Sequence, residues 1–169
     1  MKLALVGYMG SGKSFWAEKT AKALRVSMID LDTFLEQQHL KMNVPDFIYT
    51  HGELAFRKLE RLALQELCSL SEDFVLATGG GTPCYYENMQ LLNKHFTTVY
   101  LQATINTLYN RLVKEKDQRP LISHITNDTL KEFIAKHLFE RRVFYSLANY
   151  KVDVEELTLD KLINTITHA

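Results

Sequence analysis

A short glycine-rich motif near the N-terminus of this 169-residue chain constrains its fold more than any other feature. The motif reads GYMGSGKS over residues 7–14 and fits the pattern G-x-x-x-x-G-K-[ST] in full. The apolar run Lys2–Val6 before it predicts a strand, and the periodicity of Lys13–Leu24 after it predicts a helix. Since a strand that turns through such a loop into a helix opens a parallel sheet, the motif predicts an α/β fold.

The same motif predicts a binding site for the phosphates of a nucleoside triphosphate. Its glycines allow successive backbone N–H groups to turn inward around an anion, and the helix N-terminus adds partial positive charge. We expect Lys13 to reach the β and γ phosphates and the Ser14 hydroxyl to bind Mg²⁺. A glycine-rich turn without a ligand is the competing interpretation, and the flanking strand and helix disfavour it.

Further strands and helices alternate along the rest of the chain. The additional strands are predicted at Val26–Ile29, Phe74–Ala77, Thr98–Leu101 and Lys151–Val154. Helices are predicted at Thr33–His39, Glu53–Leu70 (with Leu59, Leu62, Ala63 and Leu67 on one stripe), Tyr85–Lys94, Thr104–Lys116, Thr129–Asn149 and Leu159–Ile166. This alternation predicts a five-stranded parallel sheet covered by helices on both faces, in a single domain over residues 1–169.

The composition excludes several classes of function. Twenty basic and twenty acidic residues give zero net charge, which argues against a broad surface for nucleic acid or membranes. No run of 18 apolar residues predicts a membrane span, and the N-terminus resembles a buried strand more than a signal peptide. Cys68 and Cys84 form no disulfide framework, no histidine pair has the spacing of a zinc site, and a reducing, cytoplasmic location is expected.

Two carboxylates follow the second predicted strand, at Asp30 and Asp32. Ligands of open α/β sheets bind at the carboxyl ends of strands, and residues i and i+2 of an extended segment share a face. One carboxylate can therefore hold the water shell of a metal ion while the other meets a substrate hydroxyl. The alternative is that Asp32 only caps the helix that follows.

An arginine and a glycine triplet lie further along the chain. Arg57 has Glu53 and Glu60 at helical spacing, which a solvated ion-pair ladder would explain, yet arginine is also suited to binding a carboxylate through two hydrogen bonds. Gly79, Gly80 and Gly81 follow the third strand and indicate close approach of the backbone to a ligand. A flexible turn is the alternative for the triplet.

The polar segment Lys114–His124 contains Pro120 and lies between two predicted helices. It predicts a mobile lid over about residues 112–124 that brings Arg119 to the site, a plain surface loop being the alternative. The base-reading motif of GTPases is missing, because Phe96 ends the string Asn-Lys-His-Phe where a carboxylate is required. The chain is too short for the accessory domains of motor or transport ATPases, so a small-molecule kinase fits best.

Taken together in this order, the motifs resemble those of the shikimate kinases. The matching features are the loop at 7–14, the Asp30 and Asp32 pair, the string Gly52-Glu53-x-x-Phe56-Arg57-x-x-Glu60, the Gly79–Gly81 triplet, Arg119-Pro120-Leu121 and Arg141-x-x-x-Tyr145. They cover most of the chain, from Gly7 to Tyr145. The loop alone is common to many nucleotide-binding proteins, whereas the ordered combination is specific to this family.

The resemblance implies roles for individual residues. ATP would be cradled by Gly10, Ser11, Gly12, Lys13, Ser14 and Phe15, with Arg119 closing over its phosphates and Arg111 near the adenine. Ser14 and, through water, Asp30 would hold Mg²⁺, while Asp32 would orient the 3-hydroxyl of shikimate or accept its proton. Shikimate would also be bound by Arg57, Arg141 and the triplet Gly79, Gly80 and Gly81, within a helical substrate-binding segment at about residues 32–70 and the elements beside it. A monomer is expected.

Two aromatic residues depart from the family pattern. Phe15 and Trp16 follow the loop where threonine and a small aliphatic residue are usual, which implies either weaker nucleotide binding or packing of the rings on neighbouring helices. The acidic segment Val152–Leu157 offers no basic or amide residue for the adenine. A gluconate kinase, a nucleoside-monophosphate kinase and a non-catalytic nucleotide-binding regulator are the alternative functions.

Overall fold

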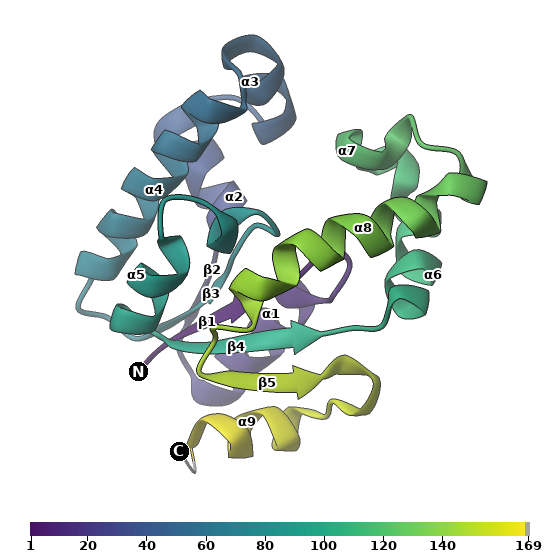
Figure 1. Cartoon of the computed structure of the whole chain (residues 1–169). Helices are drawn as coiled ribbons and strands as arrows, with labels where there is room; N and C mark the ends of the chain where they lie inside the picture. Colours follow the sequence, from purple (N-terminus) through teal and green to yellow (C-terminus); the bar gives the residue numbers. More distant parts are fainter. Residues whose placement is uncertain (168–169) are drawn as a thin grey trace.

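A parallel sheet of five strands lies at the centre of the protein, in a computed structural model that describes residues 1–167 (Figure 1). The strands are β1 (Lys2–Val6), β2 (Ser27–Asp30), β3 (Phe74–Ala77), β4 (Thr97–Gln102) and β5 (Tyr150–Asp153). Their order across the sheet is β2-β3-β1-β4-β5, and all four pairings are parallel. The predicted α/β class with a five-stranded parallel sheet is confirmed.

Continuous apolar sequence places β1 and β3 in the middle of the sheet. In β1, Leu3 is level with Val75 of β3 on one side and with Thr97 of β4 on the other. Every residue of β3 is buried, and β1 is buried from Leu3 onward. The edge strand β5 buries Val152 alone among its residues. Central strands of a parallel sheet are covered on both faces, so their sequences need no polar alternation.

Helices cover both faces of the sheet. They are α1 (Lys13–Leu24), α2 (Leu31–Leu35), α3 (Val44–His51), α4 (Glu53–Ser69), α5 (Asn88–His95), α6 (Ile105–Glu115), α7 (Pro120–Ser123), α8 (Asn127–Tyr145) and α9 (Leu159–Thr167). Helix α1 packs on β1, β2 and β3 and contacts α9, which packs on β5. Helices α4 and α5 pack together over the opposite face, and α8 crosses above the strands (Figure 1).

Several predicted boundaries were wrong by a few residues. The helix predicted at Tyr85–Lys94 starts only at Asn88, because Tyr86 and Glu87 have φ values of 48° and 56°, outside the helical region. The helix predicted at Thr129–Asn149 runs from Asn127 to Tyr145. Strands β2, β4 and β5 are each displaced or extended by one residue at their ends.

The apolar stripe predicted for α4 was wrong at one position. Leu62 is 50% exposed, and the buried face of the helix includes Phe56 and Leu64 beside the predicted Ala63 and Leu67. Two charged residues, Arg57 and Glu60, occupy the same buried face. Periodicity identified the helix. The face that it buries is not its most apolar face, because that face also carries the two charged residues of the site described below.

The chain between β2 and α4 is more helical than the sequence predicted. The predicted helix Thr33–His39 begins at Leu31 as α2 and continues from Glu36 to Leu40 as a π-helical turn. Helix α3 follows, with Pro45 in its first turn and Asn43 as its N-cap. Figure 1 shows α3 projecting beyond the sheet, together with the start of α4.

The segment predicted as a lid contains short helices. A 3-10 turn at Lys116–Gln118 follows α6, and α7 begins at Pro120. Ile122, within α7, is fully buried. The segment thus contains helical turns and a buried side chain, and its movement as a lid stays a prediction.

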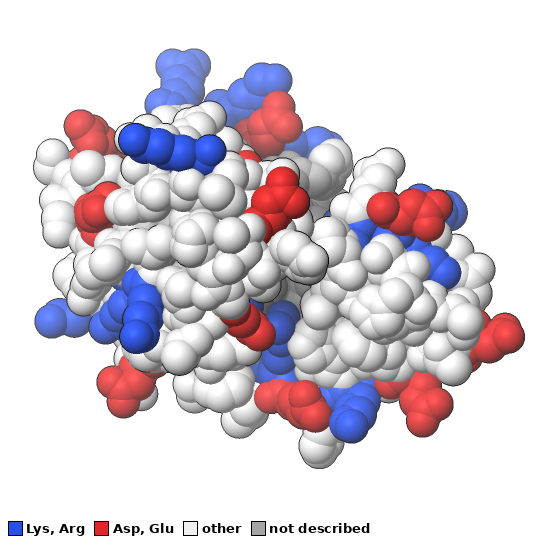
Figure 2. Space-filling model, turned by 90° about the horizontal axis from the view of Figure 1, so that it is seen from above, with Lys and Arg blue, Asp and Glu red and all other residues white. Residues whose placement is uncertain are grey.

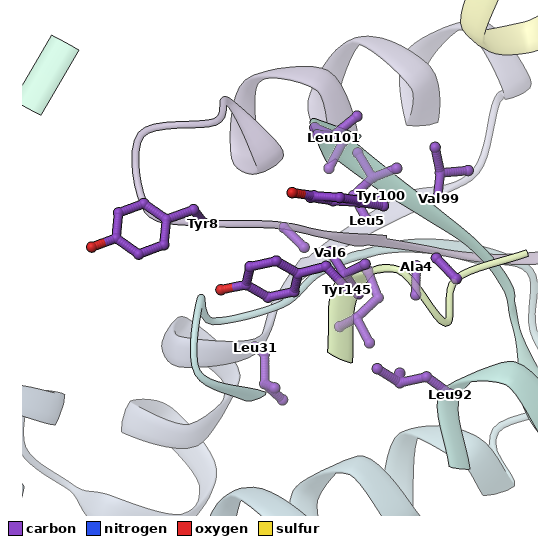
Figure 3. Close-up of a cluster of buried hydrophobic side chains, with 14 of the residues drawn as sticks. Ala4, Leu5, Val6, Tyr8, Leu31, Leu92, Val99, Tyr100, Leu101 and Tyr145 are labelled. Carbon is purple, nitrogen blue, oxygen red and sulfur yellow. The ribbon is translucent and has the colours of Figure 1, made fainter. Parts of the chain in front are cut away.

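Apolar side chains from both sides of β1 and β4 fill the core. Figure 3 shows Leu5 and Val6 of β1 beside Tyr100 of β4, with Tyr145 of α8 packed next to them. No helix in residues 1–167 is long and apolar enough to cross a membrane. On the face shown in Figure 2, basic and acidic side chains are interspersed among larger uncharged areas.

Candidate active site

The glycine-rich loop between β1 and α1 has the geometry of an anion-binding nest. Gly10 and Gly12 have φ values of 79° and 94°, which a side chain would disfavour, and Gly12 is the N-cap of α1. The Nζ atom of Lys13 donates hydrogen bonds to the carbonyls of Gly7 at 2.8 Å and Tyr8 at 2.9 Å. Backbone N–H groups, a helix N-terminus and an ammonium group thus converge at one point.

Lys13 has charged neighbours from the carboxylate pair and from the segment predicted as a lid. Burial and, to a smaller extent, the positive charge of Arg119 lower the pKa of Lys13 to about 8. Asp32 and Asp30 act in the opposite direction and favour the charged ammonium. The loop, the carboxylate pair and the lid arginine are therefore close enough to interact electrostatically.

Asp30, and not Asp32, caps helix α2. Its Oδ1 atom accepts hydrogen bonds from the backbone N–H groups of Asp32 at 3.1 Å and Thr33 at 3.3 Å. Its Oδ2 atom accepts a hydrogen bond of 2.9 Å from the hydroxyl of Ser14. The alternative that Asp32 serves as the cap was wrong, because the helix begins two residues earlier than predicted. The Asp32 side chain therefore takes no part in capping the helix.

Asp32 occupies the junction between the loop and the glycine triplet. Burial raises its pKa to about 6, and the negative charges of Asp30 and Glu60 raise it as well, against the effect of Lys13. A Cβ atom on Gly79 would lie 3.3 Å from Oδ1 of Asp32. A carboxylate with a raised pKa in such a cleft is suited to proton transfer.

Arg57 is held against the glycine triplet by a buried carboxylate. Its Nη1 atom donates a hydrogen bond of 2.8 Å to Glu60, which is fully buried, and Nη2 lies 3.3 Å from the more exposed Glu53. Burial alone would lower the pKa of Arg57, but the charge and hydrogen bond of Glu60 outweigh that effect and raise it. The ion-pair ladder exists, but it is buried at Glu60 and not merely solvated.

The triplet approaches these arginines closely. A Cβ atom on Gly81 would lie 2.3 Å from Nη2 of Arg57, and one on Gly80 would lie 3.5 Å from Nη1 of Arg141. The hydroxyl of Thr82 donates a hydrogen bond of 2.6 Å to Glu60, which ties the turn to α4. Gly80 and Gly81 therefore pack against the two guanidinium groups and Gly79 against Thr82 and Asp32, and the flexible-turn alternative does not describe them.

Cys84 lies at the edge of this arrangement. Burial raises the pKa of its thiol to about 11, although the positive charges of Arg141 and Arg57 act to lower it. Its neighbours therefore include both arginines, and the thiol stays protonated at neutral pH. Cys84 and Cys68 are both free.

A cavity of about 460 Å³ joins the loop to the triplet. Its walls include Gly10, Gly12, Lys13, Ser14, Phe15, Asp30, Asp32, Gly79, Gly80, Arg111 and Arg119. Four predicted residues, Ser11, Arg57, Gly81 and Arg141, lie outside this lining. Ser11 is buried within the loop, Gly81 is the last residue of the triplet, and Arg57 and Arg141 lie against Gly81 and Gly80.

Two predicted arginines approach the cavity from α6 and the lid. The Nη1 atom of Arg111 donates a hydrogen bond of 2.9 Å to the carbonyl of Gly10, within the loop. Arg119 donates to Glu115 through Nε at 2.9 Å, and both side chains line the cavity. Arg119 thus already faces the loop with a carboxylate as its partner.

The aromatic residues after the loop have different environments. Phe15 is 55% exposed and lines the cavity, with Lys19 over its ring at 4.4 Å. Trp16 is partly buried against the core and meets Phe15 edge to face at 5.4 Å between ring centroids. The expectation that both rings pack on neighbouring helices was wrong for Phe15, whose contacts are with its own helix.

The sequence predictions missed five residues that line the cavity: Met9, Trp16, Thr78, Glu115 and Val154. Thr78 and Val154 directly follow the carboxyl ends of β3 and β5, so the rule that ligands bind at this edge could have indicated both. Glu115 has no such signal, because its place in the cavity depends on how α6 is oriented.

A phosphate-binding loop on a parallel sheet, joined by one cavity to a buried carboxylate and a pair of arginines, defines the class of P-loop kinases that act on small molecules. The comparisons with known proteins agree. A family model described as shikimate kinase matches residues 9–169. The chain belongs to the shikimate kinase family and is an enzyme, a kinase.

Individual relatives match almost the whole chain. A shikimate kinase of Flavobacterium johnsoniae is 43% identical over 166 residues, covering 98% of this chain and 96% of the relative. The crystal structure of shikimate kinase from Bacteroides thetaiotaomicron superimposes with a TM-score of 0.91 at 33% identity, covering 100% of this chain and 99% of that one. Shikimate kinase from Acinetobacter baumannii in complex with shikimate gives a TM-score of 0.86 at 27% identity, covering 99% and 93%.

Proposed function

We propose that this chain transfers the γ-phosphoryl group of ATP to the 3-hydroxyl of shikimate, giving shikimate 3-phosphate and ADP in the biosynthesis of chorismate and aromatic amino acids. One observation supports this most directly. The carboxylate of Asp32, with a pKa raised to about 6, lies between Lys13 of the phosphate-binding loop and the glycine triplet beside Arg57 and Arg141. An acceptor bound against the arginines would present a hydroxyl to Asp32.

The nucleotide would bind along the loop. The backbone N–H groups of Gly10 to Phe15 surround the phosphates, and the Lys13 ammonium leaves its two carbonyl partners for the β and γ oxygens. Arg119 adds positive charge from the lid once its pairing with Glu115 gives way to phosphate. Arg111 and Val154, on the wall of the same cavity, are the neighbours of the adenine.

The residues beside Ser14 fit the Mg²⁺ ion that accompanies ATP. Ser14 Oγ and Asp30 Oδ2 lie 2.9 Å apart, so both oxygens can face one hydrated cation. Mg²⁺ is commonly held by one or two protein oxygens together with water and substrate phosphates, and when bound it neutralises charge on the β and γ phosphates. Ser14 would bind directly, and Asp30 through water.

The acceptor would bind between α4, the triplet and α8. Arg57 and Arg141 pair with the carboxylate of shikimate, because planar guanidinium groups match planar carboxylates. Asp32 orients the 3-hydroxyl and accepts its proton, while the backbone of Gly79, Gly80 and Gly81 forms the wall against the ring. Closure of the lid over residues 112–124 then excludes water and limits hydrolysis of ATP.

We further propose that the enzyme acts as a monomer in a reducing, cytoplasmic compartment. The site described above uses residues of a single chain, and both cysteines are free thiols.

A coupled assay of ADP release tests the proposed function. The purified chain is offered shikimate, gluconate and nucleoside monophosphates in turn, each with ATP and Mg²⁺. Shikimate should give the highest kcat/KM, and mass spectrometry should detect shikimate 3-phosphate. A better turnover of gluconate or of a nucleoside monophosphate would replace the proposed acceptor, and ATP binding without any acceptor-dependent release would indicate a non-catalytic regulator.

A further inference from the structure

A tyrosine inside the phosphate-binding loop contacts helix α8 at a distance from the reacting groups. The ring of Tyr8 is 1% exposed, and Figure 3 shows its hydroxyl directed away from the core. That hydroxyl lies 2.8 Å from Nδ1 of His137, and the two rings meet edge to face. The two residues are 129 positions apart in the sequence, so the contact joins the loop to α8, which only the tertiary fold brings together.

Both partners of this hydrogen bond are uncharged at neutral pH. Burial and, to a smaller extent, the positive charge of Arg141 lower the pKa of His137 to about 4, against the effects of Glu140 and Glu53. Burial also raises the pKa of the Tyr8 hydroxyl, against the effect of Arg141. At neutral pH the imidazole is therefore uncharged, and the Tyr8 hydroxyl and Nδ1 of His137 share a neutral hydrogen bond whose donor depends on the imidazole tautomer.

His137 belongs to a row of three residues on one face of α8. His137, Arg141 and Tyr145 are spaced by four and by four, so they lie one above the other along the helix. Tyr145 donates a hydrogen bond of 2.6 Å to the carbonyl of Gly80 in the triplet. The helix is thus fastened on one side of Arg141 to the phosphate-binding loop and on the other side to the glycine triplet.

Tyr8 also contacts the residue that binds phosphate. Its backbone carbonyl accepts a hydrogen bond of 2.9 Å from Lys13 and one of 3.1 Å from the N–H of Ser11. The triplet touches the same loop, since a Cβ atom on Gly80 would lie 3.3 Å from the backbone nitrogen of Met9. The position of Arg141 is therefore fixed relative to the loop by contacts at both of its flanks.

We propose that Tyr8 and His137 are positioning residues, which hold α8 at the distance from the phosphate-binding loop that lets Arg141 bind the carboxylate of the acceptor. This inference rests on the proposed role of Arg141. Neither residue lines the cavity between the loop and the triplet, and the hydrogen bond between the two side chains involves none of the groups proposed to react. Their effect is on the placement of a guanidinium group about one helical turn away.

Matched substitutions separate positioning from packing. Tyr8→Phe removes the hydroxyl and keeps the ring in the core. His137→Leu removes the hydrogen-bonding partner of Tyr8, whereas His137→Asn retains a polar amide close to the place of Nδ1. Because asparagine is the poorer helix former of the two, better function of His137→Asn cannot come from helix propensity. Tyr109→Phe is the control, since Tyr109 bonds α8 only through a 3.5 Å contact with Asn127 at the other end.

Steady-state kinetics with shikimate and ATP give the readout. Tyr8→Phe and His137→Leu should each raise KM for shikimate about fivefold, as expected for one net hydrogen bond, while kcat and KM for ATP stay within twofold of the unmodified enzyme. The double variant should cost no more than either single one, because both remove the same contact. His137→Asn should restore most of the affinity, and Tyr109→Phe should change neither constant.

The results distinguish failure of this inference from failure of the proposed function. If the unmodified enzyme does not phosphorylate shikimate, the proposed function fails. If it does, and Arg141→Ala raises KM for shikimate while Tyr8→Phe and His137→Leu do not, the positioning role is wrong. Equal losses in kcat, both KM values and thermal stability would also overturn it, because they would indicate general damage to the fold.

Discussion

At the scale of single residues, the site holds two ionisable groups whose pKa values are drawn toward each other. Burial lowers the pKa of Lys13 to about 8 and raises that of Asp32 to about 6, because both charged forms lose contact with water. Their mutual attraction opposes these shifts without cancelling them. Lys13 and Asp32 are therefore both charged only in the interval between these values.

The kcat/KM of the enzyme should be highest between these two pKa values. As pH rises through about 6, Asp32 loses its proton and can act as a base, so kcat/KM should rise; above about 8, Lys13 loses its charge and kcat/KM should fall. Asp32→Asn should reduce kcat by about 10²–10⁴-fold and remove the acidic limb, while ATP affinity measured by titration stays nearly unchanged. Unchanged turnover would exclude Asp32 as the base, and lost ATP binding would make it structural.

Asp30 combines two duties that substitutions can separate. Asparagine remains a good N-cap, so Asp30→Asn should preserve stability in urea unfolding, whereas Asp30→Ala should lose about 1 kcal/mol through the cap of α2. Both variants lose the negative charge beside Ser14, so both should need several times more Mg²⁺ for half-maximal rate. A normal Mg²⁺ requirement in Asp30→Asn would show that the carboxylate is needed only for the helix.

At the scale of elements, α4 and the glycine turn after β3 fit together through buried polar groups. Glu60 of α4 is fully buried and accepts hydrogen bonds from Arg57 at 2.8 Å and Thr82 at 2.6 Å. Asn88, at the start of α5, donates to the carbonyl of Thr82 at 2.9 Å. A buried carboxylate with two such partners is satisfied, and it fixes both the guanidinium group and the turn.

The closeness of this fit predicts the effect of one added methyl group. Gly81→Ala would place a carbon 2.3 Å from Nη2 of Arg57, so the guanidinium group must move away from the proposed carboxylate site. KM for shikimate should rise at least tenfold, with KM for ATP unchanged, in the same coupled assay. Gly52→Ala is the control for a glycine substitution nearby, since a Cβ atom there meets nothing within 4 Å, although its φ of 87° adds some strain. Equal effects of the two variants on KM would contradict the proposal for Gly81.

At the scale of the whole molecule, the cavity lies at the carboxyl ends of β2, β3 and β5, between the phosphate-binding loop and the end of α6. Figure 1 shows α3 and α4 on one side and α6, α7 and α8 on the other, with the ends of the strands between them. Arg119 directly precedes α7, and its carboxylate partner Glu115 is the last residue of α6. This ion pair joins neighbouring parts of the chain and involves no residue of the sheet.

Limited trypsin digestion tests closure of the lid. Cleavage after Lys114 and Lys116 should slow at least severalfold when ADP and shikimate are both bound, and less with either ligand alone, because a closed lid is less accessible. Cleavage after Arg25, which is exposed behind α1, should keep its rate and serves as the internal control. Equal rates at the lid with and without both ligands would exclude closure.

Much of the fold followed from local sequence. The helix Lys13–Leu24 and the strands Lys2–Val6 and Phe74–Ala77 have the predicted bounds, because glycines, apolar runs and helical periodicity act over a few residues. The start of α5 could not be predicted in this way, since Tyr86 and Glu87 adopt positive φ without being glycine. The exposure of Leu62 was equally hidden, because it depends on which neighbours α4 meets.

The sequence by itself determined the chemistry of this protein: the loop with Lys13 and Ser14, the carboxylates after β2, and arginines of a kind that binds planar anions. Only the tertiary structure decided how these groups divide their work. It made Asp30 the cap, raised the pKa of Asp32, and brought His137 to Tyr8 across 129 residues. The physical reason is the distance along the sequence over which each effect acts. Motifs depend on the backbone geometry of neighbouring residues, whereas burial and electrostatic interactions depend on residues that only folding brings together.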